Sequence, residues 1–83
     1  MHIRLRFFAS LREALGPSGT LELPEGSTVA DARAALVALG GAHANALAPG
    51  RAVRAALDQA MCADDAPLRE GAELAFFPPV TGG

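Results

Sequence analysis

The sequence predicts a small α+β domain of two layers, in which a mixed sheet is covered on one face by one main helix. Three observations support this fold class. Short segments near both ends alternate apolar and polar residues, which is typical of half-buried strands. A longer central segment repeats apolar residues at helical spacing. The chain has 83 residues, which leaves room for a single core.

The first two strands are predicted to form a hairpin. Residues 2–8 alternate, with Ile3 and Leu5 on the side that should face the core. Residues 9–15 are rich in helix formers and end at a Gly-Pro pair, which predicts a short helical turn. Residues 20–23 resume the alternation and stop at a Pro-Glu-Gly turn. The second strand therefore returns beside the first through a loop that contains this helical turn.

The main helix is predicted to begin at Thr28. Its hydroxyl can accept from a first-turn amide, and the carboxylate of Asp31 suits the positive end of the helix. Gly40-Gly41 ends the segment, and residues 42–50 are predicted to be a loop that contains one helical turn. Four apolar residues recur on one face of this helix: Val29, Ala32, Leu36 and Leu39.

Residues 51–63 are ambiguous, because their alanines favour a helix whereas the spacing of Val53, Ala55 and Leu57 favours a strand. We interpret residues 51–57 as a strand, followed by a turn at Asp58-Gln59 and a short strand through Met61. Otherwise the hairpin would lack sheet partners. The last predicted strand covers residues 73–77, with Leu74 and Phe76 facing the core.

Composition and charge exclude several classes of function. Hydrophobic residues make up 51% and charged residues 19%, and the formal net charge is −2 with no basic cluster, so we expect no nucleic-acid partner. A chain this small has little protein to shape a catalytic pocket, so we expect no enzyme activity of its own. Cys62 is the single cysteine, and His2 and His43 are far apart in sequence, so we expect no metal site. With no export signal or membrane span recognised, the prediction is a cytoplasmic protein.

The last six residues differ from the rest. Pro78 and Pro79 cannot continue a sheet ladder and favour extended backbone, and Gly82 and Gly83 carry no Cβ. We therefore divide the chain into a domain of residues 1–77 and a tail of residues 78–83. Such a tail can enter a narrow channel and bring its carboxylate to another protein's catalytic groups. A frayed end is the structural alternative.

Three segments together resemble the small subunit of molybdopterin synthase. They are the ending FFPPVTGG over residues 76–83, the opening Phe7-Phe8-Ala9 with Arg12-Glu13 behind it, and Pro67-Leu68 with Gly71. The resemblance extends over essentially the whole chain. It implies the ubiquitin-like β-grasp fold, which agrees with the predicted order of elements.

The resemblance also implies a chemistry. Gly83 would be adenylated by an ATP-using activating enzyme and converted to a thiocarboxylate with sulfur from a donor protein. The tail (Pro78, Pro79, Val80, Thr81 and Gly82) would then enter the large subunit, where sulfur passes to cyclic pyranopterin monophosphate to form the dithiolene of molybdopterin. Two small chains would flank a large-subunit dimer. The chain itself would bind no cofactor, since ATP serves the activating enzyme.

Residue parity predicts a docking surface. Phe8 shares its side of the first strand with arginines, and Phe77 shares its side of the last strand with Glu73, so both rings should face away from the helix. Met61 would extend this surface, and Arg12 matches the family's opening motif. Scattered surface hydrophobics and a solvated helix face are the alternative explanations.

Other functions remain open. A sulfur carrier for thiamine or cysteine biosynthesis would share the Gly-Gly end, and so would a ubiquitin-like modifier that forms isopeptide bonds with lysines. A plain interaction domain with a flexible end would not need Gly82 and Gly83. Cys62 is interpreted as a buried, inert thiol, because no neighbouring Lys or His in the sequence would activate it.

Overall fold

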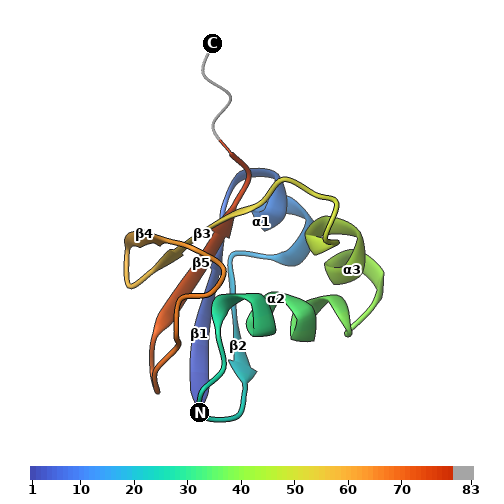
Figure 1. Ribbon diagram of the computed structural model, residues 1–83. Coiled ribbons are helices and arrows are strands. Elements are labelled where there is room, and N and C mark those ends of the chain that lie inside the picture. Colours follow the sequence, from blue (N-terminus) through green and yellow to red (C-terminus); the bar gives the residue numbers. More distant parts are fainter. Residues whose placement is uncertain (80–83) are drawn as a thin grey trace.

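The computed structural model describes residues 1–79 and confirms the α+β fold. The sheet has the strand order β2-β1-β5-β3-β4 (Figure 1). It is mixed, because β1 and β5 are parallel whereas the other neighbouring strands are antiparallel. The elements in chain order are β1 (His2–Phe7), α1 (Ala9–Leu15), β2 (Ser18–Glu22), α2 (Val29–Val37), α3 (Gly41–Leu47), β3 (Arg54–Leu57), β4 (Ala60–Cys62) and β5 (Glu73–Phe77).

Both predicted hairpins form. β1 and β2 are antiparallel, and α1 occupies the loop between them. β3 and β4 are joined by Asp58 and Gln59, whose φ angles of 50° and 69° are those of a tight two-residue turn. The strand interpretation of residues 51–63 is therefore confirmed, although the first strand begins at Arg54 and not at residue 51. Pairing of β3 with β5 outweighs the helical preference of the alanines.

The main helix starts as predicted. The Asp31 N–H donates to the Thr28 hydroxyl (3.3 Å), and the Thr28 N–H donates to the Asp31 carboxylate (2.8 Å), so the two residues form a capping box. Val29, Ala32 and Leu36 are buried. The prediction that Leu39 shares their face was wrong. Because α2 ends at Val37, Leu39 lies in the following turn and is 64% exposed.

The prediction of a loop with one helical turn over residues 42–50 was only partly right, because the helical part is longer and forms α3, which spans Gly41–Leu47. Gly40 and Gly41 have φ angles of 76° and 55°, which let the chain turn sharply after α2 and begin a second helix. Leu47 is fully buried at its end. The C-terminal end of α3 is held by Arg33 of α2. The Arg33 guanidinium donates hydrogen bonds to the carbonyls of Leu47 (2.7 Å), Ala48 (2.8 Å) and Arg51 (2.8 Å).

The core lies between the helices and the inner face of the sheet. The rings of Phe7 and Phe76, which are neighbours on β1 and β5, stack with their centroids 6.3 Å apart. Because β5 runs parallel to β1, its last residue lies at the end of the sheet opposite Met1 (Figure 1). Within residues 1–79, no helix has the length and apolar character needed to span a membrane. The largest fully buried side chains are Phe76, Ile3, Leu36, Leu47, Leu74 and Val29.

Candidate functional site

The tail begins where β5 ends. Phe77 is the last residue of β5 and pairs with Arg54 of β3. Pro78 and Pro79, which we call the tail root, follow outside the ladder and are half-buried. Val80, Thr81 and Gly82 of the predicted tail, and Gly83, which is predicted to be the reactive residue, lie outside the described residues.

The register brings the predicted docking residues together on the face of the sheet that carries no helix. Phe7 pairs with Phe76, so Phe8 follows beside Phe77, and the Phe8 N–H donates to the Phe76 carbonyl (3.2 Å). In the next row, Met61 pairs with Ala56, and Ala56 pairs with Ala75. We call the apolar residues on this face the outer patch, in which Ala56 and Ala75 are themselves buried: Phe8, Ala56, Met61, Ala75 and Phe77.

Exposure is uneven across the outer patch. Phe8 is 41% and Met61 56% exposed. Phe77 is half-buried, less exposed than the sequence suggested, because β5 lies between β1 and β3 and has neighbours on both sides. Two of the three large exposed hydrophobic residues found in the described part of the chain thus belong to this patch. Such a cluster marks an interaction surface more often than scattered residues do.

Arginines border the outer patch. The Arg6 guanidinium lies 5.5 Å from the centre of the Phe8 ring and 3.7 Å from the Glu73 carboxylate. Arg54 stands beside Phe77 in the same cross-strand row. A partner surface that suits this patch has an apolar centre and carboxylates at its border.

Arg12 lies next to the patch on another element. It is an exposed residue of α1, and its backbone N–H donates to the Phe8 carbonyl (3.3 Å). The structure thus places Arg12 one helical turn from Phe8.

Cys62 is half-buried on β4 and not buried as predicted. Burial raises the pKa of its thiol, and the nearby Asp64 carboxylate raises it further. Both effects keep the thiol protonated, which makes it a poor nucleophile at neutral pH.

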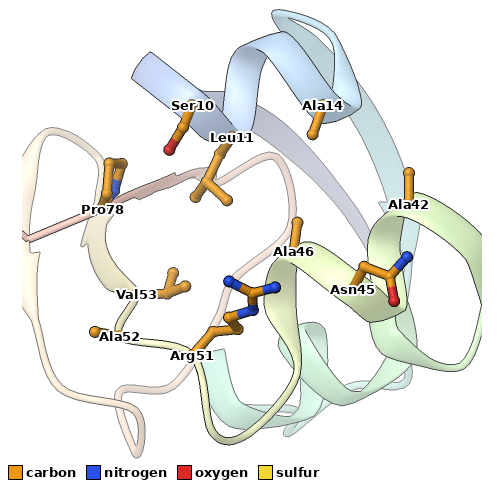
Figure 2. A pocket seen from close by; sticks show the side chains of 10 residues that line it. All are labelled: Ser10, Leu11, Ala14, Ala42, Asn45, Ala46, Arg51, Ala52, Val53 and Pro78. Atoms are coloured by element: carbon orange, nitrogen blue, oxygen red, sulfur yellow. The ribbon is translucent and has the colours of Figure 1, made fainter.

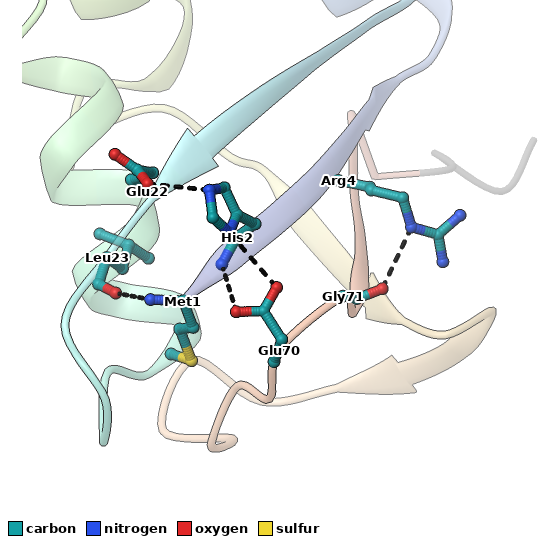
Figure 3. Close-up of polar contacts among 7 residues, drawn as sticks. All are labelled: Met1, His2, Arg4, Glu22, Leu23, Glu70 and Gly71. Carbon is teal, nitrogen blue, oxygen red and sulfur yellow. Dashed lines mark hydrogen bonds and ion pairs between the residues drawn. The ribbon is translucent and has the colours of Figure 1, made fainter.

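A polar cluster lies at the other end of the sheet (Figure 3). The His2 ring contacts the carboxylates of Glu22 (2.8 Å) and Glu70 (3.4 Å), and the His2 N–H donates to Glu70 (3.0 Å). Nearby, the N-terminal ammonium donates to the Leu23 carbonyl (2.6 Å), and the Arg4 side chain donates to the Gly71 carbonyl (3.1 Å). These contacts join β1 to β2 and to the turn before β5. Among the described residues, no group of three His, Cys, Asp or Glu is arranged to hold a metal ion.

The structure also shows a cavity that the sequence did not predict. It has a volume of about 600 Å³ and lies between α1, α3 and the segment before β3, with Pro78 in its wall (Figure 2). The sequence offered no signal for it, because one of its walls is α3, which sequence reasoning took for a loop with one helical turn.

A mixed sheet with parallel first and last strands, a helix across one face and a tail leaving the end of the last strand defines a ubiquitin-like β-grasp protein. The comparisons agree with this class. The crystal structure of Haloferax volcanii small archaeal modifier protein 1 is similar with a TM-score of 0.77 and 29% identity, covering 95% of this chain and 98% of that chain. A chain in the complex of subunits 1 and 2 of Helicobacter pylori molybdopterin-converting factor has the same fold, with a TM-score of 0.70, 23% identity and complete coverage of both chains.

The sequence comparisons define the family. The model of the ThiS family matches residues 5–83. The Escherichia coli K12 molybdopterin synthase sulfur carrier subunit is 41% identical over 81 residues, which cover 98% of this chain and 99% of that protein. The chain therefore belongs to the ThiS family, together with this sulfur carrier subunit.

Proposed function

We propose that the protein is the sulfur-carrier small subunit of a molybdopterin synthase. The observation that carries the proposal is the position of the outer patch directly beside the tail root, because Phe77 belongs to the patch and Pro78 follows it. A partner that covers Phe8 and Phe77 also receives the start of the tail. The similarity to the E. coli sulfur carrier subunit supports this function over other carriers of the same fold.

The proposed reaction begins with activation of Gly83. Its carboxylate attacks the α-phosphate of ATP in the activating enzyme and releases pyrophosphate. A carboxylate cannot lose oxygen unaided, whereas the acyl-adenylate has AMP as a good leaving group. The donor protein delivers sulfur at the oxidation level of hydrosulfide. This sulfur attacks the acyl carbon, displaces AMP and leaves a thiocarboxylate on Gly83.

Sulfur transfer follows in the large subunit. The sulfur of the Gly83 thiocarboxylate is a soft nucleophile, and it attacks a carbon of cyclic pyranopterin monophosphate to form a thioester. Water then cleaves the acyl C–S bond, which leaves the sulfur on the pterin and restores the Gly83 carboxylate. A second thiocarboxylated chain supplies the other sulfur of the molybdopterin dithiolene in the same way. The large subunit supplies the acids and bases. This chain contributes a handle and a docking surface, so it is non-catalytic on its own and binds no cofactor.

The test is intact mass after incubation with an activating enzyme, ATP and a sulfur source. We expect one oxygen to be replaced by sulfur, and fragmentation should place the change on Gly83. A chain lacking Gly83 is the control and should stay unchanged. Adding a large subunit and the pyranopterin precursor should then yield dithiolene product. An unmodified mass under conditions that modify the E. coli carrier would refute the proposal.

A second candidate function is protein modification, which the likeness to small archaeal modifier protein 1 favours. In that case Gly83 would form isopeptide bonds with target lysines. Conjugates of higher mass that disappear when Gly82 and Gly83 are deleted would support it. The FFPPVTGG ending favours the molybdopterin carrier over this modifier and over carriers for thiamine or cysteine biosynthesis.

A further inference from the structure

The cavity beside the tail root is an open apolar groove, which we call the helix groove. Its volume of about 600 Å³ is in the range of small-ligand sites. Its lining residues are Ser10, Leu11, Ala14, Ala42, Asn45, Ala46, Arg51, Ala52, Val53 and Pro78 (Figure 2). Alanine, leucine, valine and proline make up most of this wall, and Ser10 and Asn45 add polar atoms.

Arg51 is the charged residue of the groove. Its backbone is held on both sides, because its N–H donates to the Ala48 carbonyl (2.8 Å) and its carbonyl accepts from Arg33 (2.8 Å). Its guanidinium points into the groove between Val53 and Ala46 (Figure 2). Within residues 1–79 this guanidinium makes no ion pair or hydrogen bond. The groove therefore suits an apolar ligand that carries an anionic group.

The protein's own tail has this chemistry and starts in the wall of the groove. After Pro78 the sequence continues with Pro79, the apolar Val80, Thr81 and two glycines. Five residues beyond Pro78 reach at most about 17 Å, and a sphere with the groove's volume is about 10 Å across, so the tail is long enough to cross it. In the proposed function Gly83 carries a carboxylate, and later a thiocarboxylate, and both are anions.

We propose that, between encounters with partners, Val80–Gly83 folds back into the helix groove and the anionic group of Gly83 pairs with the Arg51 guanidinium. This inference rests on the proposed function for the identity of that group. Tethering favours it, because a ligand on a short flexible linker is present at an effective concentration of about millimolar. Bidentate pairing with a carboxylate is the geometry that a guanidinium provides.

Docking in the groove would cover the reacting carbon of the tail while the outer patch stays open. The groove lies among α1, α3 and the segment before β3, whereas the outer patch lies on the helix-free face. A partner can therefore bind the patch first and draw the tail out of the groove afterwards.

The test uses NMR of the full-length ¹⁵N-labelled protein without any partner. Arg51→Gln should shift the amide resonances of Gly82 and Gly83, and deletion of residues 80–83 should shift the Arg51 side-chain Nε–H. The charge-matched control is Arg69→Gln. Arg69 is exposed and lies before β5, at the opposite end of the strand from Pro78, so it should leave the tail resonances unchanged.

A second variant tests the groove without removing Arg51. Ala42→Asp adds a carboxylate to the lining near the start of α3, where an acidic residue favours the helix, so a changed tail does not reflect a lost fold. It should shift the Gly82 and Gly83 amides in the same direction as Arg51→Gln. Removal of Gly83 by a carboxypeptidase should be about 1.5- to 5-fold faster in Arg51→Gln, as expected for loss of one exposed ion pair. It should also be faster in Ala42→Asp, because the added carboxylate repels the anionic group of Gly83.

Three results would overturn the inference: identical Gly83 resonances in the wild type and Arg51→Gln, equal effects of Arg51→Gln and Arg69→Gln, or tail shifts that depend on protein concentration. The last result would mean that the tail binds a second copy. Thiocarboxylate formation by the activating enzyme is measured separately. Its failure in both the wild type and Arg51→Gln would refute the proposed function while leaving the docking result intact.

Discussion

Replacing Arg33 should destabilise the helical wall beside the tail. The Arg33 guanidinium donates to three carbonyls at the end of α3 and just after it, at 2.7–2.8 Å. Hydrogen bonds from a charged donor are worth about 1.5–3 kcal/mol each, but water can reach part of this site and replace some of them. We therefore expect Arg33→Met to lower the free energy of unfolding by about 2–3 kcal/mol in total, less than the sum of three such bonds.

This loss is large for a chain of this size. At about 0.05–0.15 kcal/mol per residue, 83 residues have roughly 4–12 kcal/mol of stability. The melting temperature should fall by about 10–20 °C. Urea unfolding followed by circular dichroism measures the effect, because the protein has no Trp or Tyr for fluorescence.

Arg33→Lys is the matched control. It keeps the charge, but a single ammonium group cannot reach three carbonyls at once, so its stability should fall between those of the wild type and Arg33→Met. Hydrogen exchange should speed up more in α3 than in α2. An Arg33→Met protein within about 0.5 kcal/mol of the wild type would show that the three contacts do not hold α3 in place.

Three further predictions concern the partner, acid stability and the thiol. Phe8→Ser should raise the Kd for a large subunit about 10- to 60-fold, measured by calorimetry. The reason is that covering the exposed 41% of Phe8 buries about 60–100 Å², which is worth roughly 1.5–2.5 kcal/mol. Leu39→Ser, at an exposed site outside the patch, should leave the Kd unchanged. The hydrogen bond from the His2 N–H, together with the positive charges of His2 and the N-terminus, lowers the pKa of Glu70 from its ordinary 4.5. Its stabilising effect should thus be complete above pH 4.5 and disappear as the pH falls further, so Glu70→Gln should be less stable than the wild type at pH 7 but not at the lowest pH of a denaturation series. Cys62 should react with iodoacetamide more slowly in the folded protein than in urea at pH 8, because its thiol pKa is raised; equal rates would contradict this.

Local patterns predicted the elements that local interactions specify. The alternation of β1 and β5 was visible in the sequence, and so was the Thr28–Asp31 capping box that starts α2. The helix α3 was not visible, because its sequence GAHANAL has one large apolar residue and its C-terminal carbonyls are satisfied from another helix. Arg33 is 14 residues from Leu47 in the sequence, so no local pattern links the two residues.

In the candidate site, too, local patterns predicted some features, whereas others depend on the fold. Strand parity was enough to place Phe8 and Phe77 on the helix-free face, because side chains alternate along any strand. The half-burial of Phe77 follows from the strand order, because β5 lies between β1 and β3. Alternation along a single strand gives no information about strand order. The helix groove combines residues of α1, α3, the segment before β3 and the tail root, which only the fold brings together, and so Arg51 could not be recognised as part of a site.

The position of β5 couples docking to delivery. Phe77 is fixed by its pairing with Arg54 on one side of the strand, and the neighbouring Phe8 N–H holds the Phe76 carbonyl on the other. The last residue of the outer patch is thus also the last paired residue of β5, and the tail root follows it directly. From Phe77 to Gly83 the chain can extend by at most about 20 Å. If the proposed function holds, a partner that covers the patch needs its catalytic groups within that distance of Phe77, so the length of the tail limits which enzymes can use the chain as a carrier.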